Sequence, residues 1–242
     1  VNFLVADVFD FLEHKSNIFW EFFKRNYVTV ASVFLYNGRA ILNTVVYCGL
    51  AILTALLVNP LAAYAMSRYK LPTSYKIILV LMLTMAFPPM VMGIPTFLLI
   101  KKLGLLNTFA ALVLPAAANG YFIFLLKGFF DSLPSELFES ATIDGAKEWQ
   151  IFWNVAMALS KPIMAVIALN AFNAAYRNFM MAFLLCQDRS MWTLMVHIYQ
   201  LIQRSSQGVG FAALVVASIP TFGVFVFCQN IIIRGIVVPT EK

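Results

Sequence analysis

Long apolar segments alternate with short polar stretches along most of this chain, and this pattern predicts its main elements. Five segments, of about 18 to 27 residues each, are long enough to cross about 30 Å of hydrocarbon as helices. These predicted spans are Ala40–Met66, Ile77–Ile100, Phe109–Leu126, Pro162–Cys186 and Phe211–Ile233. The chain is therefore predicted to be an all-α integral membrane protein with five visible transmembrane helices.

Prolines interrupt three of the predicted spans. Pro88 and Pro89 lie near the middle of the second, which must be kinked or broken there because proline cannot donate a helical hydrogen bond. Pro115 and Pro220 interrupt the third and fifth. Residues 1–38 mix aromatic and charged side chains without an apolar run near 20 residues. They are expected to form an amphipathic lead-in to a membrane region at residues 39–242.

Composition supports the membrane assignment. The chain is 62% hydrophobic and 12% charged, about half of the roughly 25% charged residues of soluble domains. The net charge of +6 is spread without a basic patch, which argues against a nucleic-acid partner and favours anchoring at lipid headgroups. No metal site is expected, because the three cysteines and two histidines lack metal-ligand spacing.

A polar island, Glu136–Pro162, stands out from the apolar background. No Asp or Glu occurs between Phe22 and Phe130, and then five acids follow closely: Asp131, Glu136, Glu139, Asp144 and Glu148. Pro134 suits a first helical turn, and Gly145 suits the left-handed residue that ends a helix. Two short helices joined at Asp144–Gly145 are predicted.

The second of these helices carries an aromatic stripe at helical spacing, formed by Trp149, Phe152, Trp153 and Ala156. One interpretation is an interfacial helix that rests its tryptophan face in the bilayer. The other is a docking element, since aromatic residues within a polar surround are typical of protein interfaces. Spacing alone leaves both open.

The island resembles the EAA loop of ABC-importer permeases, a Glu-Ala-Ala pattern followed three residues later by Gly. The matching positions are Glu139, Ala141, Asp144, Gly145 and Ala146, in the form usual in the carbohydrate-uptake (maltose-type) branch. Ser140 replaces the middle Ala, and Met157–Ala158 stands where Leu-Pro is usual.

Further stretches resemble the same branch in the same order, from Asn43–Thr44 through residues 62–69, 103–108 and 122–134 to residues 229–235. The resemblance covers roughly residues 39–242 and implies the MetI-like permease fold. That fold usually has six helices, so the sixth is expected ahead of Val1.

The resemblance also implies an orientation and roles. Lys and Arg are divided eight against eight between the two sides, so the positive-inside rule does not decide. The family places the loop, here residues 131–161, in the cytoplasm against an ATPase, and the lead-in outside it. Glu139 would then contact a basic residue of the ATPase and Gly145 would set the turn. Trp149, Phe152 and Trp153 would fasten the loop to the membrane helices.

A second set of candidate residues lies in the fourth predicted span, where Asn170, Asn173 and Arg177 form one polar stripe. With Tyr176 they could line a substrate pathway, the amides bonding sugar hydroxyls. Alternatively the asparagines tie helices together and Arg177 extends to the interface.

The implied function is a permease subunit of an ATP-driven, binding-protein-dependent sugar importer of the inner membrane. Its expected partners are an ABC ATPase dimer, a second permease subunit, an extracytoplasmic solute-binding protein and membrane lipid. No cofactor is expected on this chain, since ATP and Mg²⁺ belong to the ATPase. The chain lacks a G-x-x-x-x-G-K-[ST] phosphate loop and is not expected to be an enzyme. A stand-alone secondary transporter or channel is the alternative, but such proteins tend to place acids within the membrane, and no predicted span holds one.

Overall fold

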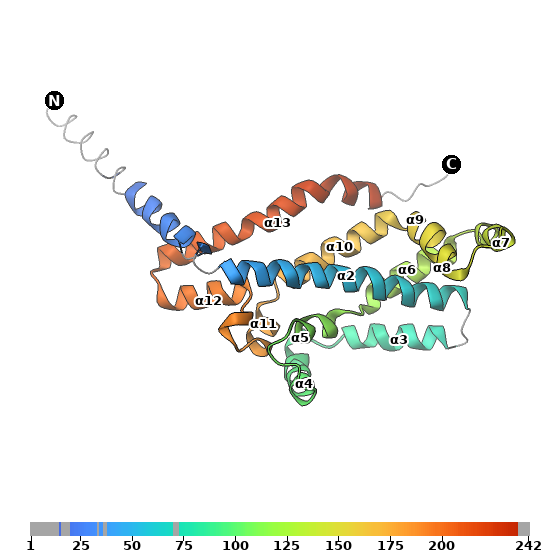
Figure 1. Cartoon of the computed structure of the whole chain (residues 1–242), viewed down its shortest axis with the longest axis horizontal. Helices are drawn as coiled ribbons and strands as arrows, with labels where there is room; N and C mark the ends of the chain where they lie inside the picture. Colours follow the sequence, from blue (N-terminus) through green and yellow to red (C-terminus); the bar gives the residue numbers. More distant parts are fainter. Residues whose placement is uncertain (1–14, 16–19, 33, 36–37, 70–72, 237–242) are drawn as a thin grey trace, which may run out of the picture.

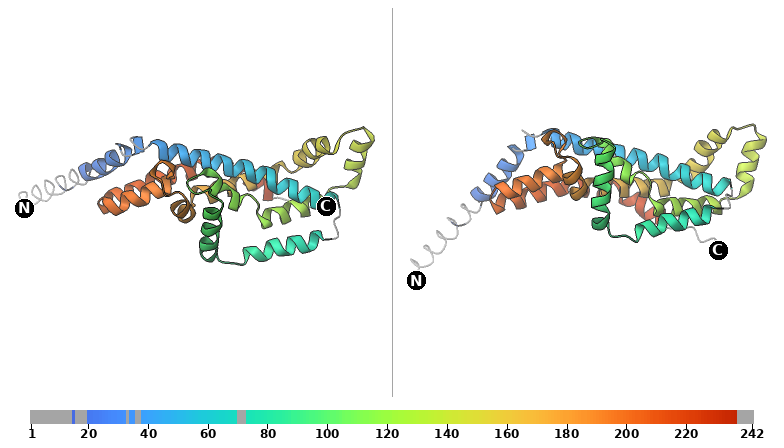
Figure 2. Two further views of the ribbon diagram at one scale, coloured as in Figure 1. Left: turned by 60° about the horizontal axis from the view of Figure 1, so that its bottom comes forward. Right: turned by 90° about the horizontal axis from the view of Figure 1, so that it is seen from below.

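The computed structural model describes residue 15 and residues 20–32, 34–35, 38–69 and 73–236, and this part of the chain is helical with connecting turns and loops. The molecule is elongated, and its long helices run along one axis (Figure 1). α2, Gly38–Arg68, extends for 31 residues through the middle of the bundle. α7 and α8 lie at one end of this axis, and α12 lies at the other (Figures 1 and 2).

The remaining elements follow in chain order. The helices before the polar island are α3 (Ser74–Met85), α4 (Pro89–Lys102), α5 (Phe109–Val113), the 3-10 turn η1 (Leu114–Ala116) and α6 (Gly120–Ser132). The island contains α7 (Ser135–Ile143), α8 (Glu148–Ile151), the π-helical turn η2 (Phe152–Ala156) and α9 (Met157–Leu159). The chain continues with α10 (Lys161–Tyr176), α11 (Phe179–Leu185), the 3-10 turn η3 (Arg189–Met191), α12 (Leu194–Arg204) and α13 (Gln207–Ile236).

Two helices are long and apolar enough to cross a membrane alone, namely α2 and the stretch Gln207–Val226 of α13. Two pairs also qualify if each is one bent span: Phe109–Ala116 with Gly120–Ser132, bent by 49°, and Glu148–Leu159 with Lys161–Tyr176, bent by 81°. By length and composition, the described residues thus provide two to four candidate spans, where the sequence predicted five.

The second predicted span is divided as its prolines indicated. α3 ends at Met85 and α4 begins at Pro89, and α4 turns across the long axis (Figures 1 and 2). With 12 and 14 residues, the two helices are about 18 and 21 Å long, each short of the membrane's thickness. The predicted break is confirmed.

The fourth predicted span is wrong as a single helix. α10 ends at Tyr176, and Asn178 caps α11 by accepting a hydrogen bond from the backbone N–H of Met181 at 3.3 Å. Hydropathy does not reveal this break, because apolar residues continue on both sides of an asparagine cap.

Two asparagines fix the bend between η1 and α6. Asn119 caps α6 by accepting from the N–H groups of Tyr121 and Phe122. Its own N–H donates to Oδ1 of Asn59, a fully buried side chain of α2, at 2.8 Å. The bend is therefore tied to α2 by polar contacts inside an apolar bundle.

Two hydrophobic clusters make up the core. One joins the first half of α2 to α5, α11, α12 and α13 and includes Val30 of the lead-in. The other joins the second half of α2 to α6, α7, α8 and α10. Residues 20–32 of the predicted lead-in are helical, and most of residues 1–19 lie outside the described part of the chain.

Candidate functional site

α7 presents one exposed polar face that ends in an exposed isoleucine. Glu136, Glu139, Ser140 and Ile143 recur at helical spacing and are all exposed. Ile143 is 86% exposed, whereas Phe138 on the other side of α7 is 2% exposed and belongs to the core. Among the described residues, neither Glu136 nor Glu139 has an ion pair. This face is available to a partner.

The turn after α7 has the hydrogen bonds of a Schellman motif. The N–H of Gly145 donates to the carbonyl of Thr142, and the N–H of Ala146 donates to that of Ala141, both at 3.0 Å. Gly145 has φ +78°, the left-handed conformation that the sequence predicted for it. Ala141 and Ala146 are half-buried against the core, while Asp144 is exposed.

The helix after the turn contains the π-helical turn η2, which the sequence pattern did not reveal. Ile151, Phe152 and Ala156 are buried, Trp153 is half-buried and Trp149 is 61% exposed. The ring of Trp149 packs against Phe152 and Trp153 of its own helix. The predicted four-residue stripe is therefore divided: Phe152 is turned inward, and Trp149 is turned outward rather than toward the membrane helices.

The island is fastened to the C-terminal part of α2. Tyr64, 5% exposed, packs its ring against Phe130, Phe138 and Phe152 at centroid distances of 6.0, 6.4 and 5.1 Å. Its hydroxyl donates a hydrogen bond to Oε1 of Glu148 at 2.7 Å.

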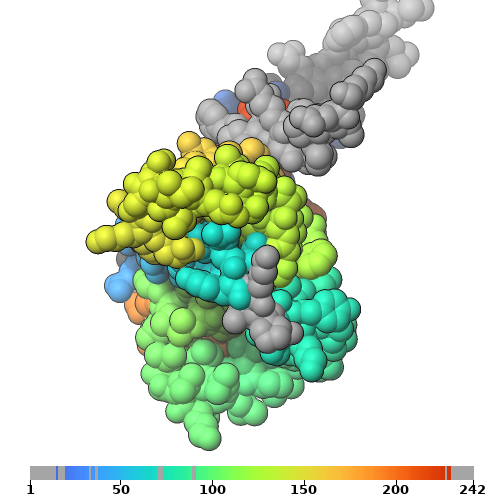
Figure 3. Space-filling model, turned by 90° about the vertical axis from the view of Figure 1, so that its right-hand side faces the viewer, coloured from blue at the N-terminus to red at the C-terminus, as the bar shows by residue number. Residues whose placement is uncertain are grey.

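One turn further along α2, the guanidinium of Arg68 lies over the Phe138 ring, 4.3 Å from its centroid. Both halves of the island are thus joined to α2. In the space-filling view of this end (Figure 3), the yellow-green island projects above the cyan C-terminal part of α2.

A small cavity with several polar side chains in a largely apolar lining lies between α2, η1 and α10. It measures about 210 Å³, below the about 300–1,000 Å³ of ordinary small-molecule sites. Its polar lining consists of Tyr47, Thr54, Asn59, Asn119, Asn170 and Asn178. Asn178 donates to the hydroxyl of Tyr47 at 2.9 Å, and Asn170 donates to the carbonyl of Val166 on its own helix at 2.9 Å.

The predicted substrate residues are not brought together. Of the four, Asn170 lines the cavity, while Asn173, Tyr176 and Arg177 do not. Tyr176 is buried, and its hydroxyl donates to the carbonyl of Ala217 in α13 at 2.6 Å, which makes it a link between helices. Arg177 is exposed at the end of α10.

Several residues of these sites escaped the sequence analysis. Tyr64 and Phe138 read as ordinary apolar residues, and the long-range contact from Tyr64 to Glu148 has no local signal. Asn59, beside a proline in a predicted span, carries a polar side chain in an apolar run, but its partner Asn119 lies 60 residues away and has no local signal. The described residues hold no group of three or more His, Cys, Asp or Glu side chains placed for a metal ion.

The structure is thus a bundle of apolar helices with a polar helical loop fastened to α2, its longest candidate span. The chain belongs to the family of binding-protein-dependent transport system inner membrane components, whose model matches residues 59–238. It is therefore a multi-pass inner-membrane permease component of the MetI type.

Named relatives agree with this family. The chain is 36% identical to Protein LplC of Bacillus subtilis over 165 residues, 62% of this chain and 56% of LplC. It is 33% identical to the polygalacturonan/rhamnogalacturonan transport system permease protein YtcP of Bacillus subtilis, over 78% of this chain and 71% of YtcP.

A solved bacterial ABC transporter, involved in the import of the acidic polysaccharide alginate, has a similar fold. One of its chains is 26% identical to this one, with a TM-score of 0.74, covering 85% of this chain and 78% of that chain.

Proposed function

We propose that this chain is the permease subunit of an ATP-driven importer for a sugar or oligosaccharide, and that its polar island couples ATP hydrolysis to transport. The observation that carries the proposal is the exposed face of α7 on a loop fastened to α2. Similar proteins that take part in polysaccharide transport support the substrate class.

In this proposal α7 docks on a separate ATP-hydrolysing subunit. Glu139 offers a basic side chain a carboxylate that has no ion pair within the described part of the chain, and Ile143 offers an apolar side chain for a pocket. Gly145 holds the turn that sets the angle between α7 and α8. Residues 131–161 are then the cytoplasmic loop, and the segment before residue 39 lies toward the other side of the membrane.

Movement of α7 would be passed to α2 through Tyr64 and Arg68. Since Tyr64 contacts both halves of the loop, a displacement of the loop by the closing ATPase dimer is expected to shift α2 as well. Such a shift, repeated in a second permease subunit, would open the pathway alternately to each side. ATP and Mg²⁺ would be bound by the ATPase, and a solute-binding protein would deliver the substrate.

The cavity at Asn170 is the proposed part of the substrate pathway on this chain. Its amides and hydroxyls can bond sugar hydroxyls. At about 210 Å³ it cannot enclose an oligosaccharide in this conformation, so the pathway must widen or be completed by the second permease subunit.

The proposal is tested with a Glu139→Lys variant in the complex with its ATPase. Because Glu139 is exposed, the variant should fold normally yet lose transport, with less transport per ATP hydrolysed. Asp188→Lys, an exposed acid beyond α11, is the matched control and should transport normally. Full, coupled transport by Glu139→Lys would contradict the proposed docking.

A stand-alone secondary transporter remains the competing function. It predicts that this chain transports substrate in vesicles that lack an ATPase, and that an ion gradient drives this transport. The apolar spans lack the acids that such ion coupling uses, so we expect no transport under those conditions.

A further inference from the structure

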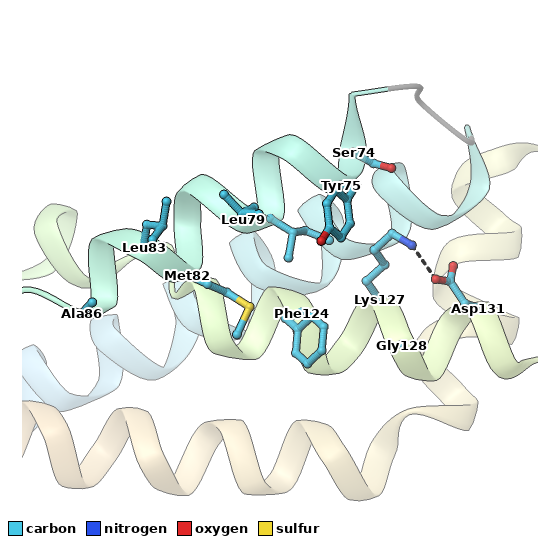
Figure 4. Close-up of a pocket in the computed structure, with 11 residues that line it drawn as sticks. Ser74, Tyr75, Leu79, Met82, Leu83, Ala86, Phe124, Lys127, Gly128 and Asp131 are labelled. Carbon is cyan, nitrogen blue, oxygen red and sulfur yellow. Dashed lines mark hydrogen bonds and ion pairs between the residues drawn. The ribbon is translucent and has the colours of Figure 1, made fainter.

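A long apolar groove runs between α3 and α6, away from the polar island's exposed face. It has a volume of about 550 Å³ and is lined mainly by apolar side chains, including Leu79, Met82, Leu83 and Phe124. Figure 4 shows these side chains along the two helices, with Lys127 and Asp131 at one end of the groove. The four apolar side chains are 43% to 57% exposed, so the groove is open to its surroundings.

The groove matches the depth of one membrane leaflet. It extends along α3 from Ser74 to Ala86, which corresponds to about 18 Å at 1.5 Å per residue. Half of the hydrocarbon core is about 15 Å thick. A single acyl chain can therefore follow the groove from the interface to the middle of the bilayer.

The end of the groove at Ser74 continues into a polar pocket of about 530 Å³. Ser74, Lys127 and Asp131 line both the groove and the pocket, and Arg68 lines the pocket. Asp131 is already bound by Lys127, in an ion pair, and by the hydroxyl of Ser67 at 2.6 Å. The side-chain charges of Arg68, Lys127 and Asp131 sum to one net positive charge at this pocket.

One N–H of the Arg68 guanidinium at this end has no hydrogen-bond partner among the described residues. It is the N–H of Nε, which is buried. The hydroxyls of Ser74 and Tyr75 lie at the same end and can donate to a phosphate. Basic pockets between membrane helices are typical sites for anionic lipid headgroups.

We infer that this groove and pocket bind one phospholipid with an anionic headgroup. Its acyl chain lies between α3 and α6, and its phosphate is bound near Lys127 and Arg68. The lipid lies in the cytoplasmic leaflet, and this choice of leaflet rests on the proposed function, because it uses the side on which α7 docks. The lipid would hold α3 and α6 at the base of the polar island, so bound lipid and loop position are expected to depend on each other.

Native mass spectrometry of the purified transporter complex, with phosphatidylglycerol and phosphatidylcholine added in equal amounts, tests the inference. Wild type should retain one phosphatidylglycerol in preference to phosphatidylcholine. Lys127→Gln should weaken that preference about five-fold, the effect of one cation near a headgroup. Inorganic phosphate in excess should not displace the lipid, because most of its contacts are with the acyl chain.

A groove-filling variant provides the second arm. Gly128 lines the groove, and a Cβ added there meets no atom within 4 Å, so the backbone of Gly128→Leu should fold normally and its side chain should occupy the groove. It should lose the lipid, while Gly49→Leu, an equally open helical glycine in α2, should retain it. This assay does not depend on transport, so its failure is distinguishable from failure of the proposed function.

Three lipid-binding results would overturn the inference. They are equal lipid binding by Gly128→Leu and wild type, equal retention of the two lipids by wild type, and displacement of the lipid by phosphate alone. A cross-link from Leu83→Cys to a helix of the second permease subunit would assign the groove to a protein partner and would also overturn it.

Discussion

Replacement of Gly145 by alanine tests the geometry of the polar island most simply. Gly145 has φ +78°, and a Cβ added there meets no atom within 4 Å. The cost of the substitution is therefore backbone strain alone, about 1–2 kcal/mol for an L-residue in the left-handed region. Opening the turn instead would sacrifice two hydrogen bonds, each worth about 0.5–1.5 kcal/mol.

Because the two costs are similar, Gly145→Ala should keep the turn in part. The ratio of closed to open turn should fall about 5- to 30-fold relative to wild type. Gly145→Asn should be milder, since asparagine tolerates this conformation. Gly145→Pro should be most severe, because proline cannot adopt the positive φ and lacks the N–H that donates to Thr142. Gly49→Ala, at a helical glycine without positive φ, should instead stabilise by about 0.5–1 kcal/mol.

The assay combines hydrogen exchange at the amide of Ala146 with the ratio of transport to ATP hydrolysis in the reconstituted complex. The exchange rate should rise, and the ratio of transport to ATP hydrolysis should fall, in the order Gly, Asn, Ala, Pro at position 145. Unchanged exchange in Gly145→Ala would refute the strain argument. Faster exchange with unchanged coupling would refute the link between the turn and transport.

Three further predictions concern packing and charge. The coupling energy between Tyr64→Phe and Glu148→Gln, measured in a double-mutant cycle of thermal unfolding, should be about 1 kcal/mol, and a value near zero would remove the hydrogen bond as a link. Phe152→Ala should lower the free energy of unfolding by about 3–5 kcal/mol because the ring is buried, whereas Trp149→Ala, at an exposed site on the same helix, should change it by less than about 0.5 kcal/mol. Burial and the charge of Arg189 lower the pKa of His197 below its ordinary value, so the unfolded chain takes up the proton first and stability should fall as the pH drops below about 6.5. Thermal unfolding between pH 8 and 5 should show a smaller loss for His197→Gln, and an equal loss would contradict the assignment.

Features that depend on one residue's own conformational limits were predictable from the sequence. The left-handed turn at Gly145 follows from the freedom of glycine, and the break near Pro88 follows from the lack of a donor in proline. The apolar segments were recognisable because hydropathy is a sum over neighbouring residues and needs no knowledge of distant contacts. Family membership followed from motifs in a fixed order, which the match to residues 59–238 confirms.

Features that depend on distant contacts were not predictable. The hydrogen bond from Tyr64 to Glu148 joins positions 84 residues apart, and nothing near either residue indicates the other. The division of the aromatic stripe, with Phe152 buried and Trp149 61% exposed, is decided by the packing of the island on α2, and the π-helical turn over Phe152–Ala156 has no signal in the sequence pattern. Tyr176 was expected to line a substrate pathway with the asparagines of α10, but the position of α13 decides that its hydroxyl is bonded to the carbonyl of Ala217.

The central claim, that α7 docks on an ATP-hydrolysing subunit, is tested most directly by site-specific photo-crosslinking in the assembled transporter. A photoreactive residue at Ile143, 86% exposed at the end of α7, should form an adduct with the ATPase subunit whose yield changes when ATP is added. The same residue at Asp188, beyond α11, should form none. Absence of an adduct from Ile143, or an equal adduct from Asp188, would contradict the account.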